Sequence, residues 1–155
     1  MDTKLKADIA ESAVVTELLR RGFRVLKPVG DRLPYDVALD VDGKLLRVQV
    51  KHAWFDKTKN IFSVDVRRTK TNRRIMRRDR YSSDDFDFAI LYIDRGPVFY
   101  TIPFHIFDSF SSTLSLVEEE KRQRKPVAWE YRERWDLLKK SSSAILSVSR
   151  GGAAR

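Results

Sequence analysis

Residues 34–51, PYDVALDVDGKLLRVQVK, carry the clearest structural signal in the sequence. It contains two strand-like runs, 36–41 and 45–51, with Asp42-Gly43 between them. An Asp-Gly pair between such runs is the strongest short-range signal for a β-hairpin. If residues 42 and 43 form the turn, residues whose numbers add to 85 lie opposite each other, so Asp36 faces Gln49. The sequence therefore predicts an antiparallel hairpin with a carboxylate where its first strand begins.

The same hairpin brings three polar side chains together. Gln49 and Lys51 are two residues apart, so the alternation of a strand points both to one side. Phosphodiester hydrolysis needs a metal held by carboxylates and a cation that stabilises developing negative charge. Taken singly, Asp36 reads as a turn residue and Lys51 as a solvent-facing strand end. Together with Gln49 they indicate a catalytic site.

Regular elements are expected on both sides of this hairpin. Apolar residues at helical spacing predict a helix over residues 3–21, and Gly22 is placed to end it in a left-handed conformation. The run FDFAILYI, residues 86–93, is apolar at nearly every position and predicts a strand covered on both faces. The remaining expectations are strands over 23–26, over 61–66 in the same sheet as the hairpin, and over 98–102, a helical turn within 104–110, and a helix from about Tyr131.

Length and composition indicate a single domain. We assign residues 1–140 to that domain and residues 141–155 to a C-terminal tail. With no cysteine and only two histidines, disulfides, thiolate zinc sites and thiol nucleophiles are excluded. A hard cation bound by oxygen ligands is the metal chemistry that this composition permits. No apolar run is long enough to span a bilayer, so we expect no membrane partner and a soluble, cytoplasmic protein.

Most of the positive charge lies in one segment. The stretch RRTKTNRRIMRRDR, residues 67–80, carries +7 of the total net charge of +9. Such a concentration favours a polyanion, because each phosphate contact releases condensed counterions; the alternative is a solvated loop or a localisation signal. The candidate DNA-binding residues are Arg73, Arg74, Arg77 and Arg78 for reading DNA, and Lys59, Arg67, Arg68 and Lys70 for phosphates.

The order of these residues resembles the PD-(D/E)xK nuclease superfamily, whose pattern is a helix Glu, then Pro-Asp, then Asp/Glu-x-Lys across a hairpin. Here the elements read Glu11, Pro34-Tyr35-Asp36 and Gln49-Val50-Lys51, and the resemblance covers roughly residues 5–95. It implies an α/β fold with a mixed central sheet flanked by helices. It also implies that Asp36 and the Val50 carbonyl bind a divalent metal.

The resemblance assigns a role to each remaining position of the motif. Lys51 is implied as the group that supports the attacking water or the phosphate, and Glu11 as a metal ligand or a residue that acts on the metal through water. Gln49 stands where the family has Asp or Glu, so it offers an amide oxygen but no negative charge. The implied cofactor is Mg²⁺ or another divalent hard cation.

Among these nucleases, a small basic chain with an arginine-rich segment after the hairpin is most similar to cyanobacterial homing endonucleases encoded in group I introns. That resemblance implies a site-specific endonuclease acting on double-stranded DNA at a long pseudo-palindromic site. Cutting both strands needs two sites, so we expect at least a homodimer, and the resemblance implies a tetramer. The alternatives are a Holliday-junction resolvase-like nuclease and a noncatalytic DNA-binding module.

Overall fold

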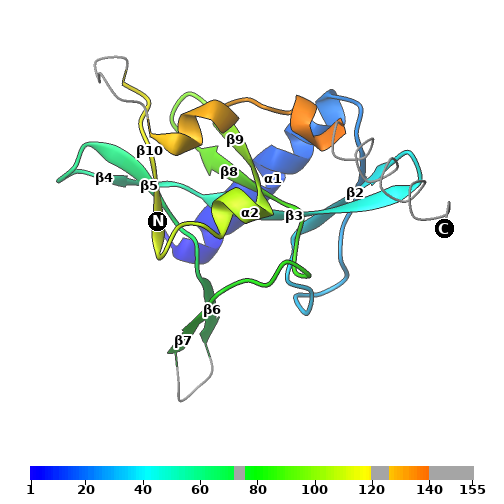
Figure 1. Ribbon diagram of the computed structural model, residues 1–155, viewed down its shortest axis with the longest axis horizontal. Coiled ribbons are helices and arrows are strands. Elements are labelled where there is room, and N and C mark those ends of the chain that lie inside the picture. The colour runs from blue at the N-terminus through cyan, green and yellow to red at the C-terminus, as the bar shows by residue number, and fades with distance from the viewer. Residues whose placement is uncertain (72–75, 120–125, 140–155) are drawn as a thin grey trace, which may run out of the picture.

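A five-stranded mixed sheet with strand order β1-β2-β3-β8-β9 forms the centre of the molecule (Figure 1). Its β3 and β8 pair in parallel, and the other neighbours pair antiparallel. The expectation of an α/β fold with a mixed sheet is therefore confirmed. The strands are β1 (Arg24–Leu26), β2 (Val37–Val41), β3 (Lys44–His52), β8 (Phe88–Ile93) and β9 (Val98–Pro103).

This computed structural model describes residues 1–71, 76–119 and 126–139. The side chains of residues 69–77 are also left undescribed. The candidate DNA-binding residues Arg73 and Arg74 and the C-terminal tail 141–155 therefore lie outside the described residues.

The β2–β3 hairpin has the register predicted from its turn. Val37 lies opposite Val48 and Val41 opposite Lys44, so paired numbers add to 85. Asp42 and Gly43 have φ angles of 52° and 78°, as a type I′ turn requires. The Gly43 N–H donates to Asp40 Oδ1 at 3.0 Å, which holds the turn. The prediction for this stretch is confirmed.

The first helix, α1 (Thr3–Arg20), packs one face against the sheet. It begins at Asp2, whose side chain accepts from the Lys4 N–H at 3.3 Å. It ends with Gly22 at φ 80° and with hydrogen bonds from Gly22 to Leu19 and from Phe23 to Leu18. This pattern is a Schellman motif, and its glycine cap confirms the predicted helix end.

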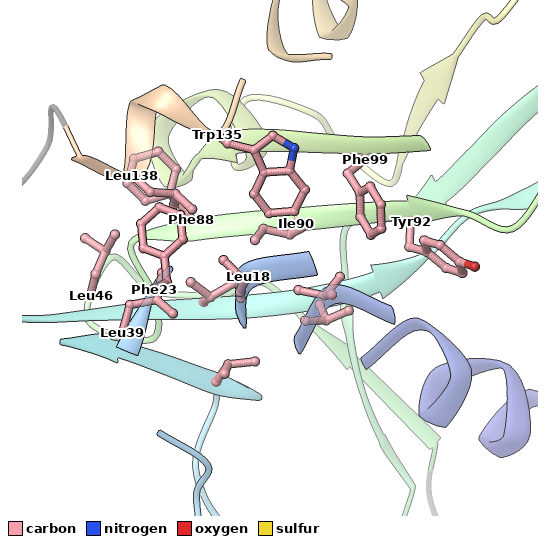
Figure 2. Close-up of a cluster of buried hydrophobic side chains, with 14 of the residues drawn as sticks. Leu18, Phe23, Leu39, Leu46, Phe88, Ile90, Tyr92, Phe99, Trp135 and Leu138 are labelled. Carbon is pink, nitrogen blue, oxygen red and sulfur yellow. The ribbon is translucent and has the colours of Figure 1, made fainter. Parts of the chain in front are cut away.

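Both faces of β8 are buried, as the unbroken apolar run predicts. Phe88, Ile90 and Tyr92 face α1 and join the cluster drawn in Figure 2, which also contains Leu18 and Trp135. The alternating residues of β8 face the opposite side and join a second cluster beneath a smaller sheet. The five-stranded sheet is thus a middle layer that can hold its strand ends in fixed positions.

The run 61–66 does form a strand, β5 (Ile61–Asp65), but its predicted place in the main sheet is wrong. It lies in a separate three-stranded sheet, between β10 (Thr113–Leu116) and β4 (Trp54–Asp56). The reason is that β8 occupies the edge of β3 in parallel. A parallel pair needs a long crossover connection, and β5 belongs to that crossover.

Two further segments complete the described chain. The basic segment forms a two-stranded ribbon, β6 (Arg68–Thr71) and β7 (Met76–Asp79), which projects from the body (Figure 1). The helical turn expected within 104–110 is confirmed as α2 (Phe104–Phe107).

The start predicted for the last helix, at about Tyr131, is wrong. A 3₁₀ helix, η1 (Val127–Tyr131), ends there, and α-helical residues begin only at 136. Glu133, with φ 54°, separates the two helical segments. Among the described residues, no helix is long and apolar enough to cross a membrane.

Candidate active site

Asp36 lies directly before β2 begins, where the edge of β3 beyond Val48 is left open. Its N–H donates to the Val48 carbonyl at 3.0 Å. Its Oδ2 accepts from the Val50 N–H at 2.7 Å and from Gln49 Nε2 at 2.8 Å. The carboxylate thus continues the ladder where a strand carbonyl would otherwise accept. Asp36 and Gln49 meet because the hairpin register places them opposite each other.

Lys51 extends to the face of the sheet away from α1. Its Nζ donates to the Arg67 carbonyl at 3.3 Å and lies 5.1 Å from the centroid of the Tyr81 ring. His52 contacts Tyr92 edge-on, with 6.1 Å between the ring centroids, and Tyr92 belongs to the cluster beneath α1. The strand alternation expected from the sequence is therefore observed at these two positions.

Glu11 approaches the same site from α1. Its Oε1 lies 2.7 Å from Lys27 Nζ, so the carboxylate is ion-paired. A cavity of about 590 Å³ is lined by all four predicted catalytic residues, Glu11, Asp36, Gln49 and Lys51, together with Val50, Thr3, Lys6, Ala7, Asp8, His52 and Trp54. A second cavity of about 290 Å³ shares Glu11 and Asp36 with it. The structure thus brings the predicted residues together at one open cleft.

Burial shifts the titration of both charged groups at the centre. Loss of solvent raises the pKa of Asp36, the Val50 N–H opposes that rise, and the Glu11 charge adds to it. Loss of solvent also lowers the pKa of Lys51, against the neighbouring charges of Asp65 and Asp36. The carboxylate would gain from a cation and the ammonium from an anion. A metal ion and a phosphate are groups of these two kinds.

The oxygen donors at the cleft suit a hard cation. Within residues 1–71, 76–119 and 126–139, no three His, Cys, Asp or Glu side chains form a cluster that could hold a metal. The Asp36 and Glu11 carboxylates, the Gln49 amide and the Val50 carbonyl nevertheless offer oxygen ligands of the type that Mg²⁺ prefers. Gln49 Nε2 now faces Asp36 and also donates to the Val50 carbonyl at 3.4 Å. To offer its oxygen there, the amide must turn over.

The described candidate DNA-binding residues lie in the β4–β5 turn, on the ribbon or at its root. Lys59 is exposed in that turn, and Arg67 and Arg68 lie where the ribbon leaves the body. On the ribbon, the backbones of Lys70 and Arg77 lie opposite each other. Arg78 pairs with Asp65, so this guanidinium is bound to the body.

Three residues near the site were not predicted from the sequence. Lys27 pairs with Glu11, and Asp65 and Tyr81 surround Lys51. Lys27 precedes Pro28 after the short strand, which leaves only its proximity to the Pro-Tyr-Asp motif as a signal. Asp65 and Tyr81 flank the basic segment, but their contact with Lys51 depends on the crossover between β3 and β8, which local patterns do not specify.

Comparison with known proteins agrees with this geometry. Residues 1–138 match the family model described as PD-(D/E)XK endonuclease. Among solved structures, the chain is similar to a bacterial homing endonuclease, I-Ssp6803I, with 47% identity and a TM-score of 0.87. The similarity covers 93% of this chain and 97% of that one. A comparison with curated proteins gave no match.

The family model spans most of the chain and includes the hairpin, the cleft and the ribbon. The helix glutamate, the Pro-Tyr-Asp stretch and the Gln-x-Lys strand occupy the positions described above within that match. The chain therefore belongs to the PD-(D/E)XK endonuclease family.

Proposed function

We propose that the chain is a Mg²⁺-dependent homing endonuclease, acting in the cytoplasm, that cuts double-stranded DNA at one long pseudo-palindromic site. One observation carries the proposal: Asp36, Gln49, Lys51 and Glu11 line a single cleft next to the basic ribbon. The homing activity named for the similar bacterial structure supports the same reading.

One of the oxygen donors is already held in place, and the others would have to reorient or give up a present partner to bind a metal. Asp36 is held by the Val50 N–H, so its second oxygen can ligate while the first remains bonded. The Val50 carbonyl and the Gln49 amide oxygen would supply neutral ligands. Glu11 would supply the second carboxylate once its ion pair with Lys27 is broken. When bound here, Mg²⁺ supplies Lewis-acid polarisation of the phosphate and a more acidic water.

Lys51 contributes the positive charge that this site needs. Its ammonium is partly withdrawn from water, which strengthens its attraction for a phosphate oxygen that gains charge in the transition state. The Asp36 and Lys51 charges lie close enough to act on each other's pKa. A scissile phosphate in the cleft would therefore lie between a negative and a positive group. Removing either side chain should strongly reduce cutting while DNA affinity is largely kept.

One site per chain requires assembly for a double-strand cut. We infer a homo-oligomer, at least a dimer and in the complete assembly a tetramer, whose symmetry matches the pseudo-palindrome. The arginines of residues 67–80 and Lys59 would bind the DNA backbone and base edges beside the cleft.

A cleavage assay tests the proposal. The chain is incubated with a random-sequence linear duplex library, plasmid and a four-way junction, with Mg²⁺ or with EDTA, and cleaved ends are sequenced. We expect cuts at one sequence with Mg²⁺ and none with EDTA. Cutting restricted to the junction would favour a resolvase. Binding without cutting of any substrate, including a selected high-affinity site, would favour a noncatalytic module.

A matched pair of variants assigns the cutting to the cleft. Asp36→Asn removes the central carboxylate, whereas Asp42→Asn makes the same chemical change at the exposed hairpin turn. We expect loss of cleavage only in the first. Equal activity in the two variants would contradict the assignment of Asp36.

A further inference from the structure

Lys51 is held by two residues at the root of the basic ribbon, which consists of strands β6 and β7. Its Nζ donates to the Arg67 carbonyl at 3.3 Å, and Arg67 directly precedes β6. Its Nζ also lies 5.1 Å from the centroid of the Tyr81 ring, and Tyr81 follows β7 by two residues. Each leg of the ribbon thus supplies one contact to the same ammonium.

Asp65 joins the two legs below the ribbon. Its Oδ1 accepts from the Arg67 N–H at 3.2 Å, and its Oδ2 pairs with the Arg78 guanidinium on β7. Asp65 ends β5 and lies opposite Thr113 of β10, so the junction belongs to the body of the protein. The Asp65 charge also acts favourably on the Lys51 ammonium.

Tyr81 can present its ring to Lys51 because the ring itself is fixed. It is only 9% exposed and packs edge-on against Phe86 and Phe107, with centroid distances of 5.0 Å and 6.3 Å. A cation over an aromatic face is attracted most strongly when it is withdrawn from water, as Lys51 is.

We propose that Tyr81 and Asp65 are positioning residues that hold the Lys51 ammonium at the cleft and join its position to both legs of the basic ribbon. The contacts of Tyr81 and Asp65 would then position both the DNA bound along the ribbon and the Lys51 ammonium that acts on the phosphate. This proposal rests on the nuclease function proposed above, and it adds two residues to which the family pattern gives no role.

The contact itself is tested without DNA or metal. The face of an aromatic ring shifts protons that lie over it upfield, so the Lys51 Hε resonances of the full chain report the Tyr81 contact by NMR. We expect upfield-shifted Hε resonances in the wild type and in Tyr81→Phe, and ordinary positions in Tyr81→Leu. Ordinary positions in the wild type, or shifted ones in Tyr81→Leu, would overturn the proposal.

The consequence for cleavage is tested by separating rate from binding. Tyr81→Leu should lower kcat about tenfold, with KM changed by less than about twofold, and Tyr81→Phe should retain the wild-type rate. Asp65→Asn should also lower kcat without weakening DNA binding. If Tyr81→Leu does not fold, Asp65→Asn decides, and an unchanged kcat in it overturns the proposal.

Phe99→Leu is the matched control, because Phe99 is a similarly buried ring, 7% exposed, in the other cluster. We expect it to keep the wild-type kcat. An equal loss in Phe99→Leu and Tyr81→Leu, or a failure of Tyr81→Phe to retain activity, would overturn the role of the ring. A wild type that binds DNA but cuts nothing would contradict the proposed function, whereas the NMR comparison would still decide the contact.

Discussion

The β2–β3 hairpin and the basic ribbon are both antiparallel pairs, but they are held in different ways. The hairpin lies inside the main sheet, with β1 and β8 on its two sides, and Val37, Leu39 and Val48 are 0% exposed. Within the described residues, the two strands of the ribbon form a sheet of their own, and contacts of Arg67 and Arg78 link the ribbon to the body. The cleft is thus built on a rigid framework, whereas the basic residues proposed to bind DNA are carried on a separate projecting element.

The largest expected effect is on the cleavage rate, when a charged side chain of the cleft is removed from the rigid region. Asp36→Ala or Lys51→Ala should lower the cleavage rate by about 10²- to 10³-fold, because each group acts on charge at the phosphate. DNA affinity, measured by fluorescence anisotropy, should stay within a few-fold of the wild type. Lys44→Ala, at the other end of β3, is the control. Loss of binding in step with loss of cutting would erase the contrast between the two regions.

The next effect removes charge from the basic segment, residues 67–80. The double variant Arg73→Ala/Arg77→Ala should bind DNA at least about tenfold more weakly at physiological salt. Its plot of log affinity against log salt should also be shallower, because fewer condensed counterions are released on binding when these cationic side chains are removed. The pair Arg20→Ala/Arg24→Ala removes the same charge from exposed positions elsewhere. The same weakening in both pairs would show that net charge, and not the ribbon, attracts DNA.

A smaller effect is expected when a substitution restores the acidic residue of the family pattern. In Gln49→Glu, a carboxylate replaces the amide that donates to Asp36. We expect the Mg²⁺ concentration that half-saturates cleavage to fall roughly tenfold, because an added ligand charge strengthens the binding of hard cations. Without metal, the melting temperature should fall, since two carboxylates then face each other. An unchanged Mg²⁺ requirement would place Gln49 outside the metal site.

The smallest effect concerns stability and its dependence on pH. Because burial raises the pKa of Asp36, the folded state binds this proton more tightly than the unfolded state. Stability is therefore lost as the pH rises through the unfolded and then the folded pKa, and it stays lost at pH 7. Asp36→Asn should raise the melting temperature of the metal-free protein at pH 7 by about 2–4 °C. Mg²⁺ should stabilise the wild type and not the variant; a lower melting temperature in the metal-free variant would contradict the stated cost of this carboxylate.

Local patterns predicted the parts of this molecule that local interactions determine. The Asp42-Gly43 turn fixed the register that brings Asp36 to Gln49, and Gly22 ended the first helix as expected. The place of β5 was missed because the parallel pairing of β3 with β8 joins segments far apart in the chain. The same crossover brings Asp65 and Tyr81 to Lys51, which no spacing in the sequence reveals.

In the proposed mechanism, the rigid hairpin would hold a divalent metal between Asp36, the Val50 carbonyl and Gln49. This arrangement is tested by a crystal structure of the wild-type chain with Ca²⁺ and an intact DNA duplex that contains its cleavage site. We predict an ion about 2.3–2.6 Å from an Asp36 carboxylate oxygen, the Val50 carbonyl oxygen and Gln49 Oε1, with the Gln49 amide turned over from its present orientation. An ion bound elsewhere, or a Gln49 amide that still donates to Asp36 beside bound DNA, would contradict the account.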